Sequence, residues 1–390
     1  MRPPLSRKLA GFGTTIFTEM TRLANERGAI NLAQGFPDFD GPDFVKRAAT
    51  SAIKAGHGQY ARMAGVPELV EALSAKYARD YQLSYDAMSE ITVTSGATEA
   101  IFATIQGLCD VGDEVVMFEP YFDSYRASVC MAGAIPRVAT LKPSDPPGEW
   151  TFDRDQVRRL FGPRTRLLLL NTPHNPTGKV FERAELDFLA ALCVEHDVIC
   201  LADEVYEHLV FDGWHVPIAR LHGMRERTVT ISSLGKTFSL TGWKVGWACA
   251  PAPLSAAIRA AHQFITFATA TPLQHGAIAA VRSDLTYFEE FVAFYRKKRD
   301  FLVRELRRIG FEVHVPAGTY FVCAGFRPFG FSDDILFAKH LIELGVAVIP
   351  PSVFYENAQY GRGYVRFAFC KRDETLSAAV DRLDALTRPS

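Results

Sequence analysis

A lysine in an unusual setting is the first residue whose chemistry stands out. Lys236 follows an apolar run, residues 228–232, in the segment Ser-Ser-Leu-Gly-Lys-Thr, among small residues and shortly before Trp243. Lysines that form Schiff bases need such a sheltered position, because burial lowers their pKa and makes the amine nucleophilic. Most lysines are surface residues, so Lys236 alone fits either a reactive amine or a solvated loop.

Two other polar residues come at the ends of apolar runs. Asp203 follows the run 198–202, where a carboxylate needs donors or a cation such as a protonated heterocyclic nitrogen. A helix N-cap is the alternative for Asp203. Asn175 lies in Asn-Thr-Pro-His-Asn-Pro-Thr-Gly, whose prolines and glycine fix a turn that presents its amide as a donor. An ordinary structural turn is the alternative there.

Two further segments suit anions. Ser-Gly-Ala-Thr, residues 95–98, separates an apolar run from a helical pattern. Backbone N–H groups at a helix start bind phosphate, and Thr98 adds a hydroxyl, although helix capping explains the segment equally well. Arg366 stands inside the apolar run 364–369. Its planar guanidinium needs an anion there, either a bound carboxylate or an internal acid.

The elements that must position these residues alternate along the chain. Apolar runs are apolar on both faces, as in strands of a parallel sheet that helices cover on both sides. The pattern predicts an α/β fold with a mostly parallel sheet. Ligands in such folds bind outside the carboxyl ends of the strands, which is where the polar segments fall. The predicted strands are 91–94, 114–118, 167–170, 198–202 and 228–232.

The chain changes character after about residue 283. A long charged helix is predicted at 287–309, followed by strands at 320–323, 346–349 and 364–369. The 390 residues also exceed what one compact core usually holds. We therefore expect a large domain over 44–283 and a smaller α+β domain built from 1–43 and 284–390.

Composition excludes several classes of protein. The net charge of −1 removes the basic footprint of a nucleic-acid binder. Seven scattered cysteines without a CxxC pair disfavour a disulfide scaffold or a zinc site and favour a reducing, cytoplasmic location. Ten histidines without an HExxH pattern suggest no metal. No uninterrupted apolar stretch is long enough to span a membrane.

Taken in order along the chain, these segments resemble the class I/II aminotransferases, enzymes of fold type I that depend on pyridoxal 5'-phosphate (PLP). The resemblance runs from about residue 31 to 371. It implies that Lys236 forms the Schiff base, that Asp203 pairs with the pyridinium nitrogen, and that Asn175 and Tyr206 contact the phenolic oxygen. It also implies that Phe122 stacks on the cofactor ring and that Arg366 binds the substrate α-carboxylate. The phosphate would be held by Ala97, Thr98, Ser233 and Lys244.

The segment 31–39, Asn-Leu-Ala-Gln-Gly-Phe-Pro-Asp-Phe, is similar to the subgroup of kynurenine, glutamine–phenylpyruvate and methionine aminotransferases. That similarity implies that Gly35 and Phe17 line the substrate site and that Tyr60 reaches the phosphate of the neighbouring subunit in a homodimer. Phe17 stands where kynurenine-type enzymes tend to carry tryptophan, and the stretch 263–272 is longer and lacks their histidine. Both differences lie where selectivity should be set, so kynurenine is not carried over as the substrate.

The resemblance implies ping-pong transamination. The amino group of an L-amino acid with an apolar, aromatic or sulfur-containing side chain would pass to a 2-oxo acid. The segments 365–367 and 369–373 also resemble N-succinyldiaminopimelate aminotransferases, which gives one alternative. A PLP-dependent β-lyase acting on cysteine conjugates is a second alternative. A PLP-sensing transcription regulator is disfavoured, because the enzyme pattern begins almost at once, without a basic helical extension.

Overall fold

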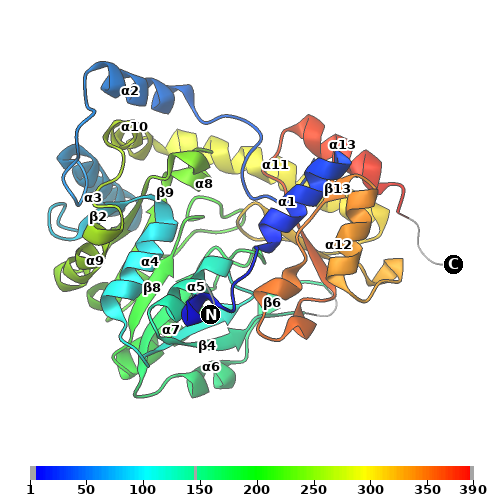
Figure 1. The fold of residues 1–390 in the computed structure, drawn as a ribbon, viewed down its shortest axis with the longest axis horizontal. Helices are drawn as coiled ribbons and strands as arrows, with labels where there is room; N and C mark the ends of the chain where they lie inside the picture. Colours follow the sequence, from blue (N-terminus) through cyan, green and yellow to red (C-terminus); the bar gives the residue numbers. More distant parts are fainter. Residues whose placement is uncertain (1–5, 145–146, 387–390) are drawn as a thin grey trace, which may run out of the picture.

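A seven-stranded sheet forms the centre of the larger part of the fold (Figure 1). The structure is a computed structural model that describes residues 6–144 and 147–386. The strands lie side by side in the order β2 (Ile91–Thr94), β10 (Gly246–Cys249), β9 (Thr228–Ser233), β8 (Ile199–Asp203), β7 (Thr165–Asn171), β3 (Glu114–Glu119) and β4 (Ile135–Thr140).

All neighbouring pairs in this sheet are parallel except the two pairs that β10 makes, with β2 and with β9. The predicted mostly parallel sheet is therefore confirmed. The chain reverses between β9 and β10, and this reversal carries a short helix, α8 (Leu234–Thr237), and the residues up to Lys244. The segment around Lys236 therefore lies at the carboxyl ends of the parallel strands, between the end of β9 and the start of β10.

Helices cover both faces of the sheet, as the apolar runs predict. Leu167 and Leu169 face one core, whereas Leu168 and Leu170 face another, as strand alternation requires. The first core is covered by α4 (Gly96–Leu108), α5 (Asp123–Met131) and α9 (Ala252–Ile265). The second is covered by α6 (Arg154–Leu160) and α7 (Arg183–Glu195). At the β2 end lie α2 (Asp43–Lys54), α3 (Pro67–Tyr81) and α10 (Thr271–Val281).

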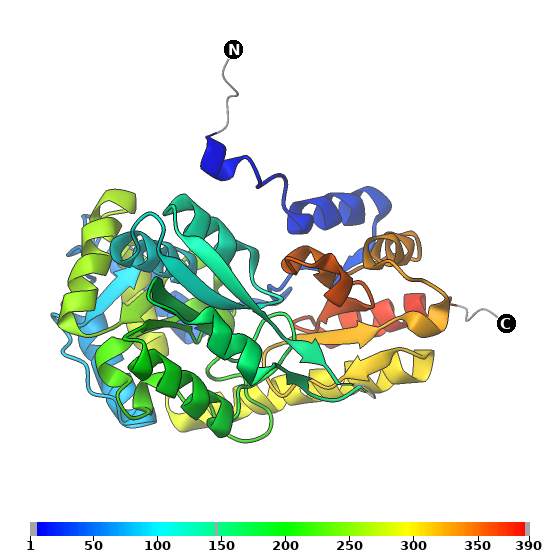
Figure 2. The same cartoon turned by 90° about the horizontal axis from the view of Figure 1, so that it is seen from below.

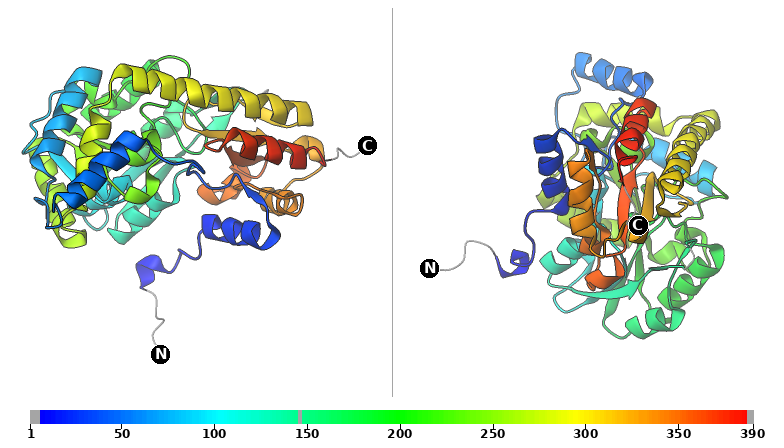
Figure 3. Two further views of the ribbon diagram at one scale, coloured as in Figure 1. Left: turned by 90° about the horizontal axis from the view of Figure 1, so that it is seen from above. Right: turned by 90° about the vertical axis from the view of Figure 1, so that its right-hand side faces the viewer.

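The remaining elements form a smaller part beside the sheet, and the 25-residue helix α11 (Leu285–Ile309) runs along both parts (Figure 3). An antiparallel sheet contains β11 (Glu312–His314), β12 (Phe321–Gly325) and β14 (Tyr364–Ala368). A second sheet pairs a strand from the N-terminal part of the chain, β1 (Ile30–Asn31), in parallel with one from the C-terminal part, β13 (Val346–Ala347). The other elements are α1 (Ile16–Arg27), α12 (Asp334–Glu343), α13 (Asp373–Leu383) and a hairpin of β5 (Lys142–Pro143) and β6 (Trp150–Thr151).

A continuous apolar core joins the two ends of the chain in this smaller part. It includes Met20 and Leu32 from the N-terminal segment and Phe337 and Leu376 from the C-terminal segment. The N-terminal 3-10 helix η1 (Arg7–Leu9) lies apart from this core (Figure 2) and contacts α5. The domain boundaries at 43/44 and 283/284 stay a prediction.

Several strand bounds differ from the sequence-based prediction. The strand expected at 346–349 ends at Ala347, and Ile349 forms only an isolated bridge with Arg366. Strands β4 and β10 were not predicted; β4 is largely half-buried and holds Pro136 and Arg137, so its sequence lacks a continuous apolar run. Within the described ranges, no helix is long and apolar enough to cross a membrane.

Candidate active site

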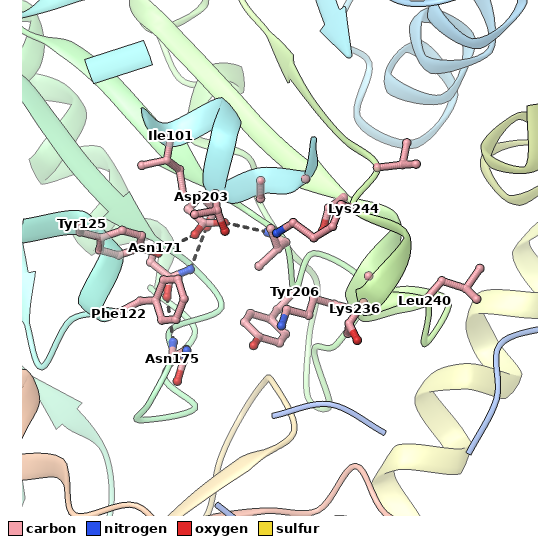
Figure 4. Close-up of a pocket in the computed structure, with 18 residues that line it drawn as sticks. Ile101, Phe122, Tyr125, Asn171, Asn175, Asp203, Tyr206, Lys236, Leu240 and Lys244 are labelled. Carbon is pink, nitrogen blue, oxygen red and sulfur yellow. Dashed lines mark hydrogen bonds between the residues drawn. The ribbon is translucent and has the colours of Figure 1, made fainter. Parts of the chain in front are cut away.

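The carboxyl ends of β7, β8 and β9 and the start of α4 surround one cavity of about 120 Å³ (Figure 4). This is the edge of the sheet where the alternating pattern predicts ligand binding. The cavity brings together most of the residues singled out from the sequence. It is lined by Ala97, Thr98, Phe122, Asn175, Asp203, Tyr206, Ser233, Lys236 and Lys244.

Lys236 lies in the four-residue helix α8, directly after β9 ends at Ser233. Its side chain faces the cavity beside Tyr206 (Figure 4). Its Nζ lies 5.5 Å from the centre of the Tyr206 ring and 5.8 Å from that of Tyr320. Burial lowers the pKa of Lys236 to about 8. Lys236 is half-buried in the wall of the cavity, which disfavours the solvated-loop alternative, and its lowered pKa favours a nucleophilic amine.

Asp203 is the last residue of β8 and is buried. Its carboxylate accepts a hydrogen bond of 2.5 Å from the Tyr125 hydroxyl and one of 3.3 Å from the Val205 amide. No described helix starts at Asp203, so the N-cap alternative does not apply. Burial raises the pKa of Asp203. A cationic ligand group would offset that penalty and restore the carboxylate.

The start of α4 forms a cradle of backbone and cationic groups. Gly96 has a φ of 78°, and a Cβ there would lie 3.1 Å from the Lys244 Nζ. A Cβ on Gly246 would lie 2.6 Å from the amide nitrogen of Ala97. Two glycines therefore let β10 and Lys244 approach the helix start closely. Exposed N–H groups, the helix dipole and an ammonium group together suit a phosphate.

Asn175 and Arg366 come from distant parts of the chain and contact one another. Arg366 Nη1 donates to Asn175 Oδ1 at 2.9 Å, and Nη2 donates to the Ala33 carbonyl at 2.7 Å. The carbonyl end of the Asn175 amide is thus committed, so its NH₂ end can donate into the cavity. The Arg366 Nε is buried without a hydrogen-bond partner among the described residues. Burial lowers the pKa of Arg366 to about 10, which leaves the guanidinium charged.

Arg366, Gly35 and Phe17 are not among the residues that line the cavity. A Cβ on Gly35 would fall 2.5 Å from a ring carbon of Phe321, so only glycine allows this close approach. The Arg366 guanidinium lies 4.1 Å from the centre of the Phe321 ring and 5.4 Å from that of Phe17. The Phe17 ring also packs against Phe354. The arginine thus lies among aromatic rings.

Tyr60 does not join the site within one chain. Its side chain is 86% exposed, and its ring contacts Phe267. In the part of the chain that the structure describes, no group of three or more His, Cys, Asp or Glu side chains is placed to hold a metal ion.

Sequence reasoning missed residues that hold the site in shape. Tyr125 lies one helical turn after Phe122 and donates to Asp203. Asn171 Nδ2 donates to the Asp203 backbone carbonyl at 2.9 Å, and its Oδ1 accepts from the backbone N–H of Asn175 at 2.8 Å. Tyr320 donates to the Gly35 carbonyl at 2.7 Å. Tyr125 could have been found from its spacing after Phe122, whereas the partners of Asn171 and Tyr320 depend on the tertiary fold.

The family model described as aminotransferase class I and II matches residues 27–383. The chain belongs to this family. The chain is 44% identical to the probable N-succinyldiaminopimelate aminotransferase of Mycobacterium tuberculosis, over 98% of this chain and 99% of that one. It is 42% identical to the methionine aminotransferase of Escherichia coli over 97% of each chain. A kynurenine–oxoglutarate transaminase of mouse is 40% identical, over 96% of this chain and 89% of its own.

Solved structures agree with the family and confirm the fold-type-I architecture. The N-succinyldiaminopimelate aminotransferase of M. tuberculosis superimposes with a TM-score of 0.95, covering 98% of this chain and 100% of that one at 44% identity. The E. coli methionine aminotransferase gives a TM-score of 0.94 at 41% identity, over 98% of this chain and 100% of that one. The aminotransferase described here is therefore a PLP-dependent enzyme, as its family is.

The described residues fit this cofactor chemically. A buried acid without a cationic partner at hydrogen-bond distance suits a pyridinium nitrogen, and Asp203 provides it. An amine with a lowered pKa suits a Schiff base, and Lys236 provides it. The α4 cradle with Lys244 suits the phosphate. The donor set of the cavity therefore matches the three chemically distinct parts of PLP.

Proposed function

We propose that this aminotransferase moves the amino group of an L-amino acid with an apolar, aromatic or sulfur-containing side chain to a 2-oxo acid. The observation that carries the proposal is the setting of Arg366, a charged and buried guanidinium flanked by the rings of Phe17 and Phe321. A cation among rings can bind a carboxylate while leaving only apolar surface for the rest of the molecule.

We assign Arg366 to the substrate α-carboxylate. Its two terminal nitrogens are held by Asn175 and Ala33, and its buried Nε lacks a partner among the described residues. An unpartnered buried donor is costly unless a ligand satisfies it. The carboxylate of an amino acid supplies an acceptor with the matching charge, and the missing side chain of Gly35 lets the Phe321 ring pack closely beside Arg366.

Lys236 would hold the cofactor and then move the substrate proton. When bound, PLP withdraws electrons from the substrate α-carbon and stores the amino group between the two halves of the reaction. The pKa of about 8 lets Lys236 Nζ take up and give back a proton near neutral pH. Asp203 would keep the ring nitrogen protonated, while Asn175 and Tyr206 would donate to the phenolic oxygen. Phe122 would lie against the ring, and Ala97, Thr98, Ser233 and Lys244 would hold the phosphate.

N-succinyldiaminopimelate is a second candidate donor, favoured by the 44% identity with the M. tuberculosis protein. That compound carries anionic groups beyond the α-carboxylate, and these would need cations around the side-chain pocket. The 42% identity with the methionine aminotransferase favours the apolar donor instead. The Phe17 ring lies 5.4 Å from the Arg366 guanidinium and 5.6 Å from the Phe354 ring, which supports the apolar interpretation.

A donor panel separates these candidates. Methionine, phenylalanine, kynurenine and N-succinyldiaminopimelate would each be paired with one 2-oxo acid, and kcat/KM measured with both substrates varied. The proposal expects parallel double-reciprocal lines and the highest kcat/KM with an apolar or thioether donor. A preference of tenfold or more for N-succinyldiaminopimelate would assign the second function. Pyruvate and ammonia from a cysteine conjugate, formed faster than any transamination product, would indicate the β-lyase.

We also propose a homodimer in which Tyr60 completes the site of the neighbouring subunit. An apolar surface supports it: Tyr60 packs on Phe267, and Phe264 nearby in the chain is 87% exposed. Such a surface is typical of subunit contacts. Mixing Tyr60→Phe subunits with Lys236→Ala subunits tests it, because hybrid dimers would regain one site with both residues intact. Absence of any regained activity in verified hybrids would contradict the assignment.

A cytoplasmic location belongs to the same proposal. All seven cysteines are free thiols in the structure, and six of them are buried. Thiols in this state are compatible with a reducing compartment.

A further inference from the structure

A buried ion pair lies behind the cavity, between α3 and the end of the sheet. Lys76 on α3 is 4% exposed and Glu207 is 5% exposed, and the Lys76 Nζ lies 3.0 Å from the Glu207 Oε2. Tyr81 and Ser232 complete the group, which we call the Glu207 cluster. Buried charges of this kind are rare unless they are paired and hydrogen-bonded.

The carboxylate of Glu207 accepts hydrogen bonds from two elements, and the His208 Nε2 lies 3.8 Å from its Oε1. Its Oε2 accepts from Lys76 and from the Tyr81 hydroxyl, both on α3, and its Oε1 accepts from the Ser232 Oγ on β9 at 2.8 Å. Burial alone would raise the pKa of Glu207, but Lys76 and the other neighbours bring it down to about 2. The group is therefore ionised at every pH at which the protein would work.

The position of the cluster in the chain links two parts of the proposed cofactor site. Glu207 directly follows Tyr206, and Ser232 directly precedes Ser233, four residues before Lys236. The hydrogen bond from Ser232 to Glu207 thus ties the turn that carries Tyr206 to the strand that leads to Lys236. Lys76 and Tyr81 fix the same carboxylate to a helix that contributes no residue to the lining of the cavity.

We propose that Glu207 is a positioning residue whose carboxylate, held by Lys76 and Ser232, sets the place of the Tyr206 hydroxyl relative to the Lys236 amine. The inference rests on the proposed roles of Tyr206 and Lys236 at the cofactor. A glutamine at 207 would keep the shape of the side chain but offer one acceptor oxygen in place of two. It would turn an N–H group toward one of the former donors and leave the Lys76 charge less compensated.

A purely structural role is the competing explanation, and Asp80 offers a matched control. Asp80 belongs to the same buried charge group, with its carboxylate 3.5 Å from the Lys76 Nζ and 8% of its side chain exposed. Its other ion pair is with its neighbour Arg79, whereas the link between Tyr206 and Lys236 runs through the hydrogen bond from Ser232 to Glu207. Asp80→Asn therefore perturbs the buried charges without breaking the link between Tyr206 and Lys236.

The experiment is a pH titration of the visible absorbance of the PLP-loaded protein, with Tm measured alongside. A hydroxyl that donates to the cofactor's phenolic oxygen favours the deprotonated form, so a displaced Tyr206 raises the titration midpoint. We expect Glu207→Gln to raise it by about half a pH unit or more, a roughly threefold change in the protonation equilibrium. Ser232→Ala should raise it less, and Asp80→Asn should lower Tm while leaving the midpoint in place.

The outcomes separate this inference from the proposed function. If the wild-type band titrates but neither Glu207→Gln nor Ser232→Ala moves its midpoint, the positioning role is wrong. Equal shifts in Asp80→Asn and Glu207→Gln would also overturn it, because a general loss of packing would then suffice. If Glu207→Gln does not fold, Ser232→Ala, which keeps the ion pair, decides alone. A wild-type band that persists unchanged in Lys236→Ala would instead contradict the proposed function.

Discussion

Two cavities are lined by neighbouring parts of the segment from the end of β8 to His208, and they differ in the side chains that line them. Asp203, Val205 and Tyr206 line the smaller one, and Glu207 and His208 line a second of about 810 Å³. The smaller cavity gathers an amine, an acid and a helix start at the ends of the parallel strands. The surface of the larger one is mostly apolar. The rings of His208 and Phe288 stack in its wall, with their centres 4.0 Å apart. The proposed active site is therefore distinguished by the convergence of strand ends and not by its volume.

The largest effect should come from the amine of the smaller cavity. Lys236→Ala removes both the anchor of the cofactor and the proton carrier, so we expect kcat to fall by about four orders of magnitude. Steady-state rates with the best donor of the panel measure it, and circular dichroism checks that the fold is kept. Residual activity above about one hundredth of wild type would show that the cavity is misassigned.

The next effect should come from the carboxylate anchor. Arg366→Lys keeps the charge but loses the planar fork, and we expect kcat/KM to fall about 100-fold, mostly through KM. Arg362→Lys serves as the matched control, since Arg362 is an exposed arginine just ahead of the same strand. Equal kinetics for the two variants would mean that Arg366 does not bind the substrate.

Removing the Tyr125 hydroxyl, which donates to Asp203, should have a smaller effect. Tyr125→Phe deletes the 2.5 Å hydrogen bond to Asp203, and bonds to charged groups contribute about 1.5–3 kcal/mol. We expect the Kd for PLP to rise about tenfold, measured by fluorescence titration of the ligand-free protein. Tyr121→Phe, which removes a hydroxyl bonded to Glu356, should leave Kd within about twofold of wild type.

The lowered pKa of Lys236 should also make the free energy of unfolding of the ligand-free protein depend on pH. Between about pH 8 and 10.5 the unfolded chain still binds the Lys236 proton, whereas the folded chain has released it. Stability therefore rises with pH in this window, by about 1–2 kcal/mol relative to Lys236→Met. Denaturant unfolding of both proteins at pH 7.5 and 10 measures the difference. A constant difference across the window would contradict the lowered pKa.

The smallest effect should come from the larger cavity. Trp214 lines it, and its side chain is 88% exposed. Trp214→Ala should change kcat/KM for the best donor by less than about twofold, because surface substitutions away from a site are nearly neutral. A tenfold loss with unchanged Tm would show that the two cavities are functionally coupled.

The sequence predicted the chemistry of the smaller cavity better than its supports. Lys236 and Asp203 in that cavity, and Arg366 outside its lining, are visible because each interrupts or follows an apolar run, where a polar group needs a reason. The mostly parallel sheet follows from the same runs. Glu207 gives no such signal, since its partner Lys76 is 131 residues away and only the fold brings them together.

Strand order and strand ends were the less predictable part of the fold. The antiparallel strand β10 begins two residues after Lys244, which takes a left-handed φ of 52° that reverses the chain without a glycine. Gly242 and Gly246 flank that reversal, but they do not specify the direction of the next strand. The pairing of Ile30 with Val346 likewise depends on contacts between the two ends of the chain, which local patterns do not encode.

The central claim is that Lys236, rather than another amine of the site, holds the cofactor. Lys244 lines the same cavity, so the question is open to direct chemistry. Borohydride reduction of the PLP-loaded protein, followed by digestion and peptide mass spectrometry, locates the modified amine. We predict that the added pyridoxyl mass lies on the peptide that contains Lys236 and is absent from Lys236→Ala. The same mass on Lys244, with Lys236 unmodified in wild type, would contradict the account.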